Sequence, residues 1–218
     1  MCSTGVVPVL EHLLEHCPLT KMAYLCHPCV QHVSKLRRED ALFELIELAW
    51  DKGFNPHCRL ETGGIRGTRK FIGTPEAQAL FSSLNISCAV YAFRHAERGR
   101  ASCCMLQAVE EYFQKGWNGS DGAKIRPTSL PPVYLQHQGH SVTIVGFERQ
   151  WDNQVNVLVF DPTHPDLHGI KKLVGKEIRE AMPAAIALLE SYRRGSKYLR
   201  KHDEFEILCL GCDDITFS

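Results

Sequence analysis

The spacing of hydrophobic positions divides the chain into a helical first half and a strand-rich second half. Apolar residues recur at helical spacing over residues 6–16, 39–51, 74–84 and 101–115. Runs rich in β-branched and aromatic residues predict strands at 86–93, 133–136, 140–149, 155–161 and 205–210. A further helical pattern covers about 170–192, and a loop rich in Gly, Ser, Asp and Pro covers 118–132. Helices followed by neighbouring strands indicate an α+β fold, with an antiparallel sheet covered by helices.

Local signals refine two of these segments. Thr74, Pro75 and Glu76 have the pattern of an N-cap, a first-turn proline and a first-turn acid, so a helix is expected to begin there. A basic cluster near the C-terminus has near-helical spacing and is interpreted as a solvated helix face. Its members are Arg193, Arg194, Lys197, Arg200 and Lys201.

Size and composition indicate one ordinary globular domain spanning residues 1–218. The formal net charge is zero, so no nucleic-acid partner is expected, and no apolar run is long enough to predict a membrane span. The N-terminus lacks the pattern of a secretory signal. Ten cysteines are therefore expected to stay reduced, which predicts a cytoplasmic or nuclear location.

A histidine and an aspartate occupy positions where two neighbouring strands can bring them together. His140 begins one apolar strand, beside Gly139, whose missing side chain is expected to allow close approach; Asp161 ends the next strand, just before Pro162. If these strands pair, the carboxylate can hold the imidazole tautomer, as in catalytic triads. Gln136 is a candidate donor to an oxyanion. A hydrogen-bonded strand end and a turn-initiating Asp-Pro are the structural alternative.

Several segments resemble the papain-like cysteine peptidases that are specific for ubiquitin-fold modifiers, above all their zinc-finger-containing deubiquitinase branch. The similar segments are Gln136–Ser141 with Thr143–Gly146, Leu158–Pro162, Ala49–Pro56 and Gly67–Thr74. The resemblance covers about residues 40 to 213. It implies a papain-like fold, ubiquitin or a ubiquitin-fold modifier and its conjugates as partners, and neither a cofactor nor a metal.

The resemblance also implies roles for individual residues. His140 corresponds to the general base, Asp161 to its orienting partner, and Gln136 to an oxyanion-hole or substrate-positioning group. His164 is a weaker alternative base, because the modifier-specific branch carries its histidine in an Asp-Pro-His box. In this chain Thr163 occupies that position and His164 is displaced by one residue, which favours His140.

The family's nucleophile box, Gly-Trp-Gly-Cys-Gly-Tyr-Arg-Asn at a helix start, has no counterpart in this sequence. A helix start lowers the thiol pKa and directs backbone N–H groups at the oxyanion. The chain between residues 26 and 42 is too short for the box and its helix, which indicates an internal deletion. None of the other candidate cysteines begins a glycine-flanked helix, so the nucleophile is unknown; the candidates are Cys26, Cys29, Cys58, Cys88, Cys103, Cys104, Cys209 and Cys212.

Two patterns raise the alternative of a zinc site. Cys26 and Cys29 have Cys-x-x-Cys spacing, and Cys209 and Cys212 have the same spacing, although the two pairs are far apart in sequence. Residues 12–16 match His-x-x-Glu-His, but no helix offers a convincing further ligand. Buried thiols and a polar helix face explain these patterns more simply.

The expected function is therefore that of a cysteine-type isopeptidase for ubiquitin or ubiquitin-fold modifier conjugates, impaired by loss of its nucleophile. The alternative is a catalytically inactive module that binds the modifier without cleaving it. Whether the chain is an active enzyme is left open.

Overall fold

The fold is a six-stranded antiparallel sheet with helices on both faces, in the strand order β1-β6-β2-β3-β4-β5. The computed structural model describes residues 38–70, 72–117, 119, 125–163, 187 and 189–211. The helices are α4 (Arg38–Asp51), α5 (Pro56–Thr62), α6 (Thr74–Ser83), α7 (Arg100–Lys115) and α10 (Ser196–Leu199). The strands are β1 (Cys88–Arg94), β2 (Val133–His137), β3 (His140–Arg149), β4 (Val155–Phe160), β5 (Arg193–Gly195) and β6 (Glu204–Leu210).

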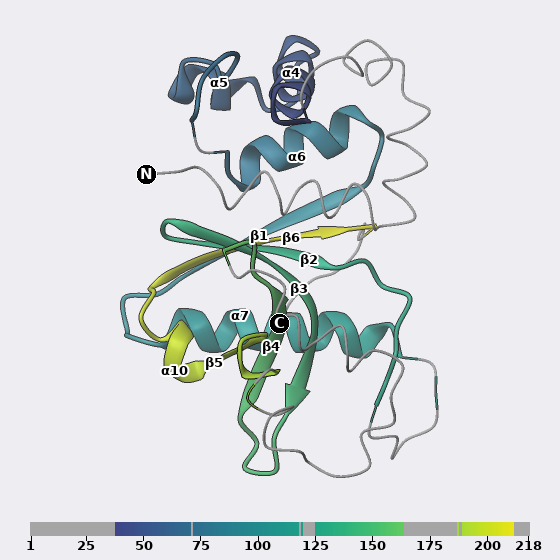
Figure 1. The fold of residues 1–218 in the computed structure, drawn as a ribbon, viewed down its shortest axis with the longest axis vertical. Coiled ribbons are helices and arrows are strands. Elements are labelled where there is room, and N and C mark those ends of the chain that lie inside the picture. The colour runs from purple at the N-terminus through teal and green to yellow at the C-terminus, as the bar shows by residue number, and fades with distance from the viewer. Residues whose placement is uncertain are drawn as a thin grey trace.

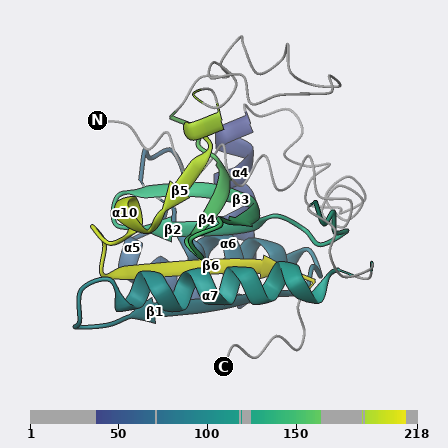
Figure 2. The ribbon, with the colours of Figure 1, turned by 90° about the horizontal axis from the view of Figure 1, so that it is seen from below.

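The sheet separates two hydrophobic cores. Figure 1 shows α4, α5 and α6 on one face and α7 on the other, and Figure 2 shows α7 lying across β1 and β6. Side chains alternate between the two cores along a strand: Tyr134 belongs to the core under α4–α6, whereas Val133 and Leu135 belong to the core under α7. The expected α+β class, with an antiparallel sheet covered by helices, is confirmed.

Most predicted elements in the described part of the chain are present within one or two residues of their expected bounds. The short helix α5 was not predicted; it begins with Pro56 and ends at Gly63, whose φ is 69°. The predicted helix at 6–16, and most of the one at 170–192, lie outside the described residues. Among the described residues, no helix is long and apolar enough to cross a membrane.

The start of α6 differs by one residue from the prediction. Gly73, not Thr74, occupies the N-cap, and its N–H donates to Glu76 Oε2 at 2.7 Å. The Thr74 hydroxyl, expected to cap the helix, instead donates to Gln136 Oε1 of β2 at 3.0 Å. A tertiary hydrogen bond has therefore replaced the local cap that the sequence favours.

The interpretation of the basic cluster as a solvated helix face is wrong for its first members. Arg193 and Arg194 lie in strand β5, which pairs with β4. Arg194 is buried, with 8% of its surface exposed. Both arginines bind carboxylates on neighbouring parts of the sheet, and these ion pairs compensate the cost of placing charged residues in a strand.

Candidate active site

A tight hairpin places His140 at the end of the sheet where β2 turns into β3. The two residues Gln138 and Gly139 connect β2 to β3, and His140 is paired with His137 where the two strands meet the turn. Gly139 has a φ of 75°, and a Cβ at this position would meet no atom within 4 Å. The glycine is therefore needed for its left-handed backbone, not for the close approach that its sequence context implied.

The alternation of the two strands directs His140 and Asp161 to the same face of the sheet. On β3, His140 is two residues from Val142, which is in the core under α7. On β4, Asp161 follows Val159, which is in the same core, by two residues. Because the side chains of a strand alternate in direction, the imidazole and the carboxylate both project on the α7 side, at the end of that core.

The structure brings the two groups into contact. His140 Nε2 lies 3.0 Å from Asp161 Oδ1, and the two side chains are 19% and 4% exposed. Burial alone raises the pKa of Asp161, but hydrogen bonds from His140, Thr163 and Arg194 outweigh it and hold this pKa well below its usual range. The carboxylate is therefore an anion near neutral pH.

This contact assigns different tasks to the two ring nitrogens of His140. A carboxylate accepts hydrogen bonds, so Nε2 carries the proton that is donated to Asp161, and Nδ1 keeps its lone pair. In the Ser-His-Asp triad the two nitrogens have the opposite roles. The arrangement can therefore accept a proton at Nδ1 and stabilise the resulting imidazolium through Asp161.

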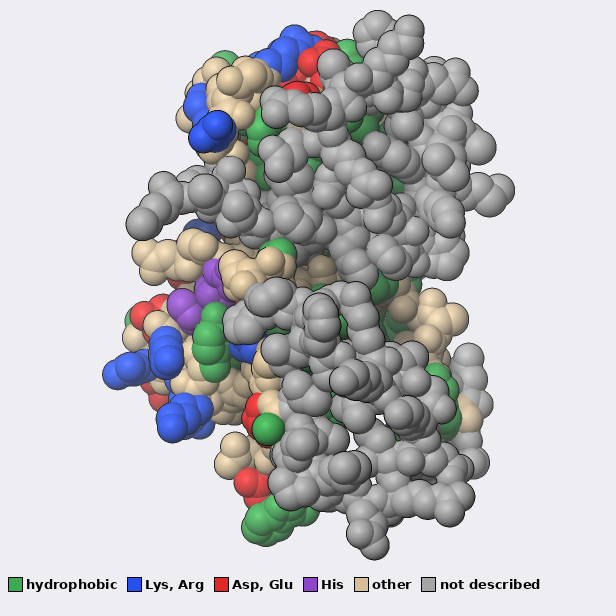
Figure 3. All heavy atoms as spheres, in the orientation of Figure 1, with side chains coloured by type: hydrophobic (Ala, Val, Ile, Leu, Met, Phe, Trp, Pro, Cys, Tyr) green, Lys and Arg blue, Asp and Glu red, His purple; other side chains and the backbone are tan. Residues whose placement is uncertain are grey.

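Other aromatic side chains form a wall beside the imidazole. His137 stacks on His202 with ring centroids 4.0 Å apart, and its centroid lies 5.6 Å from that of His140. Burial, with the nearby His202 and His140, lowers the pKa of His137 to about 4, so this ring is neutral near pH 7. Figure 3 shows histidine side chains that reach the surface as a group, with Lys and Arg side chains nearby.

Gln136 lies on the other face of the sheet from His140. It is paired with Ser141 and contacts the start of α6, where its Oε1 accepts hydrogen bonds from Thr74 N at 2.9 Å and Thr74 Oγ1 at 3.0 Å. The Tyr134 hydroxyl donates to the same oxygen at 3.2 Å. The amide oxygen is therefore fixed, and the Nε2 hydrogens point away from these donors.

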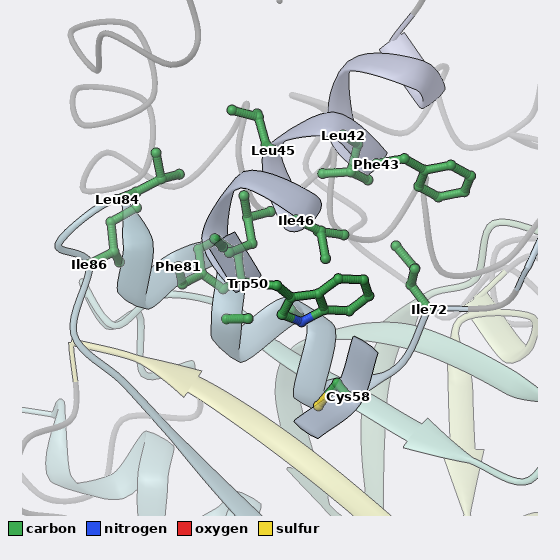
Figure 4. Packing of buried hydrophobic residues seen from close by; sticks show 14 of the residues in the cluster. Leu42, Phe43, Leu45, Ile46, Trp50, Cys58, Ile72, Phe81, Leu84 and Ile86 are labelled. Atoms are coloured by element: carbon green, nitrogen blue, oxygen red, sulfur yellow. The ribbon is translucent and has the colours of Figure 1, made fainter. Parts of the chain in front are cut away.

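Of the described cysteines, Cys58 and Cys88 lack the lowered pKa of an activated thiol, and Cys209 lacks the exposure. Burial, with the charges of Glu76 and Glu61, raises the pKa of Cys58, which lies in the core with Trp50 (Figure 4). Burial also raises the pKa of Cys88. Cys103 and Cys104 are exposed on α7, and Cys209 is buried in β6. The remaining candidate nucleophiles, Cys26, Cys29 and Cys212, lie outside the described residues.

The alternative base and the alternative metal sites cannot be placed in the fold. His164 and the His-x-x-Glu-His segment at 12–16 lie outside the described residues, as do three of the four thiols of the Cys-x-x-Cys pairs. Within the part of the chain that the structure describes, no group of three or more His, Cys, Asp or Glu side chains could hold a metal ion.

Two residues that contact the pair, and one that contacts the wall beside it, were not recognised from the sequence. Thr163 donates to Asp161 Oδ1 from its backbone N–H at 3.0 Å and from its hydroxyl at 2.7 Å. Arg194 donates to Oδ2 at 2.6 Å, and Tyr198 lies over the His137 ring edge. Thr163 has a local signal, because Asp-Pro-Thr is an Asx-type turn sequence; Arg194 and Tyr198 are brought to the site only by tertiary structure.

Comparison with known proteins supports the resemblance. The family described as Peptidase family C78 matches residues 20–208. "Zinc finger-containing ubiquitin peptidase 1" of Mus musculus is 31% identical over 88% of this chain and 30% of its own length. The Homo sapiens protein of the same name is 29% identical over 84% of this chain and 29% of its own length.

Two more distant matches carry related names. "Ubiquitin carboxyl-terminal hydrolase mug105" of Schizosaccharomyces pombe is 30% identical over 50% of this chain and 41% of its own length. The solved structure "Crystal structure of UfSP from C.elegans" is 16% identical, with a TM-score of 0.41, over 71% of this chain and 24% of that chain. The chain thus spans about 30% of the length of the Mus musculus protein.

Proposed function

The chain belongs to peptidase family C78, and from this membership we propose that His140 and Asp161 are the base and the orienting acid of a thiol-peptidase site for ubiquitin or ubiquitin-fold modifier conjugates. The observation that carries the proposal is the 3.0 Å contact between Nε2 and Oδ1, which leaves the Nδ1 lone pair for a reacting group. The names of the relatives, which contain "ubiquitin peptidase" and "ubiquitin carboxyl-terminal hydrolase", support the substrate class.

The chemistry proposed for the pair is that of a family member that keeps its cysteine box, in which the pair moves one proton in each direction during each half of the reaction. His140 Nδ1 takes the proton of a cysteine thiol, and the thiolate attacks the isopeptide carbonyl that follows the last glycine of the modifier. The imidazolium, stabilised by Asp161, then protonates the leaving lysine amine. In the second half of the reaction the imidazole removes a proton from water while the water oxygen attacks the thioester carbonyl. The C–S bond then breaks, the modifier leaves with a free carboxyl group, and the imidazolium returns the proton to the thiolate.

Gln136 is proposed to stabilise the oxyanion or position the substrate with its amide nitrogen. Its oxygen accepts three hydrogen bonds, two of them from Thr74 and one from Tyr134, and this fixes which way the amide faces. A donor that is already oriented loses little entropy when it binds a developing negative charge.

We propose that thiol-dependent hydrolysis by this chain is weak or absent, because the family's cysteine box is missing from the sequence. The raised pKa of Cys58 and the raised pKa of Cys88 favour this view, since a nucleophilic thiol needs a lowered pKa. The missing box and the raised pKa values of Cys58 and Cys88 also support the alternative function, a module that binds the modifier without cleaving it. An internal deletion within a single domain remains our account of the missing box.

Covalent labelling tests the proposal. The chain is incubated with ubiquitin and, separately, with a ubiquitin-fold modifier, each carrying a thiol-reactive group at its C-terminus, and non-covalent binding of the unmodified proteins is measured in parallel. We expect binding without efficient labelling. A labelled band that disappears with one Cys→Ala change and with His140→Asn would instead identify an active enzyme and its nucleophile.

Asp152→Asn, which changes an exposed carboxylate in the turn at the opposite end of β3 from His140, is the matched control and should leave binding and labelling unchanged. The absence of both binding and labelling for every modifier would contradict the proposed substrate class.

A further inference from the structure

We propose that Arg194 is a positioning residue for the His140–Asp161 pair, and that it acts by clamping the carboxylate rather than by contacting substrate. The inference rests on the proposed function, because it gives the pair a reason to be held in one geometry. The evidence for the clamp itself is structural and comes from the arrangement of β4, β5 and the segment after β4.

The sheet register places Arg194 on the face where Asp161 projects. Arg194 is paired with Val157 on β4, and directly paired residues of antiparallel strands project to the same side. Val157 and Val159 both point into the core under α7, and Asp161 is the next residue of that alternating series. A strand of only three residues, Arg193–Gly195, is enough to set this direction.

One terminal nitrogen of the Arg194 guanidinium binds the backbone and the other binds the carboxylate. Its Nη1 donates to the carbonyl oxygens of Ser191 at 2.8 Å and Arg193 at 3.0 Å. Its Nη2 donates to Asp161 Oδ2 at 2.6 Å. With side-chain exposures of 9% for Arg194 and 4% for Asp161, this is a buried ion pair at a fixed distance.

Arg194 on Oδ2 and Thr163 on Oδ1 together fix the orientation of the carboxylate. The two carboxylate oxygens have separate partners: Oδ2 binds Arg194, and Oδ1 accepts from His140 and Thr163. If Oδ2 were released, the carboxylate could rotate about its Cβ–Cγ bond, a torsion with broad energy wells. The hydrogen bond to His140 Nε2, and with it the tautomer of the ring, would no longer be fixed.

Arg194 also supports the wall beside His140. Its guanidinium carbon lies 5.3 Å from the centroid of the Tyr198 ring, a cation–π distance. The Tyr198 hydroxyl lies 3.3 Å from His137 Nε2. One buried arginine thus contacts both the carboxylate that orients His140 and the aromatic wall that packs against it.

The neighbouring arginine offers a matched control. Arg193 binds Glu148 with two hydrogen bonds, Nε to Oε1 at 2.6 Å and Nη2 to Oε2 at 3.1 Å. It lies in the same strand and also joins β5 to a carboxylate of the sheet, but the alternation of β5 directs it to the opposite face. Loss of the Arg193 side chain should weaken the attachment of the edge strand β5 without changing the geometry of the His140–Asp161 pair.

The test is the tautomer of His140, read from long-range ¹H–¹⁵N spectra of the histidine rings that are recorded at rising pH until the His140 resonances no longer change. The parent chain should show a protonated Nε2 and a bare Nδ1. In Arg194→Met we expect the Nδ1 resonance to move toward the average of the two tautomers. Arg194→Lys should give a smaller move in the same direction, and Arg193→Met no move.

Two results would overturn the proposal: an unchanged His140 tautomer in folded Arg194→Met, or a change of equal size in Arg193→Met. Should Arg194→Met fail to fold, Arg194→Lys decides, because it keeps the charge and loses the backbone anchorage; an unchanged tautomer in that variant contradicts the clamp. The spectra need no modifier and no thiol, so failure of the proposed function would not alter this reading.

Discussion

At the scale of single residues, one carboxylate joins three other groups of the candidate site. Asp161 accepts hydrogen bonds from His140, Thr163 and Arg194, and all three stabilise its charged form. A buried anion with this many partners is costly to remove, since its partners lose their acceptor while staying buried.

Asp161→Ala is therefore expected to lower the free energy of unfolding by about 3 to 5 kcal/mol, because it leaves the Arg194 guanidinium buried without its anion. Urea unfolding followed by circular dichroism measures this change. The exposed Asp203 is the control, and Asp203→Ala should change stability by less than about 0.5 kcal/mol. Equal losses in the two variants would show that the buried network contributes nothing.

His137 is expected to make stability fall in mild acid. Its pKa is lowered from 6.5 to about 4, so as the pH falls through this window the unfolded chain binds a proton that the folded chain does not. The loss amounts to up to about 3 kcal/mol and levels off below the folded pKa. Unfolding free energies at several pH values should show a weaker dependence in His137→Phe than in the parent.

The exposed His57 provides the comparison, and His57→Gln should keep the dependence of the parent chain. A His137→Phe variant that loses stability with acid as steeply as the parent would contradict the lowered pKa.

The residue scale also shows what the sequence could and could not predict. That His140 and Asp161 meet follows from the alternation of two predicted strands joined by a short turn, and the structure has this contact at 3.0 Å. Arg194 could not be found in this way, because its strand has three residues and follows a helical pattern. The predicted N-cap of α6 was off by one residue, because the hydroxyl of Thr74 binds Gln136, 62 residues away, instead of capping the helix.

At the scale of elements, the hairpin between β2 and β3 determines the position of His140. Its two-residue connection depends on Gly139, whose φ of 75° is strained for any residue with a Cβ. The helix-strand order of the described chain was predictable from apolar periodicity, whereas α5 and β5 were too short to produce a period.

Gly139→Ala should therefore destabilise the chain by about 1 kcal/mol through backbone strain alone, since no atom lies within 4 Å of the new Cβ. Gly146→Ala is the matched control: it lies in β3, and its Cβ would meet Leu158 at an ordinary 3.8 Å. Thermal or urea unfolding of both variants tests this, and an equal or larger loss in Gly146→Ala would contradict the role of the left-handed turn.

At the scale of the whole molecule, the fold buries two of the described thiols, leaves two exposed and leaves Cys88 half-buried. Cys58 and Cys209 are 9% and 0% exposed within the two cores, and Cys103 and Cys104 are exposed on α7. Burial makes Cys58 and Cys209 poor candidates for a nucleophile that has to reach a substrate carbonyl.

Alkylation by iodoacetamide, followed by mass spectrometry of the individual peptides, should therefore modify Cys103 and Cys104 well before Cys58 and Cys209. In concentrated urea the four rates should become similar. Rapid, selective modification of Cys58 in the folded chain would indicate an activated thiol and would contradict our account of the missing nucleophile.

The central claim, that the end of the sheet carrying His140 and Asp161 receives a ubiquitin-fold modifier, is tested most directly by a titration. The ¹⁵N-labelled chain is titrated with ubiquitin and with a ubiquitin-fold modifier while its backbone amide spectrum is recorded. We predict that one of the two shifts resonances around Gln136, His140 and Asp161 and leaves those of Cys88 and Leu210, paired at the other end of β1 and β6, in place. Spectra that both proteins leave unchanged, or shifts confined to that other end, would contradict the claim.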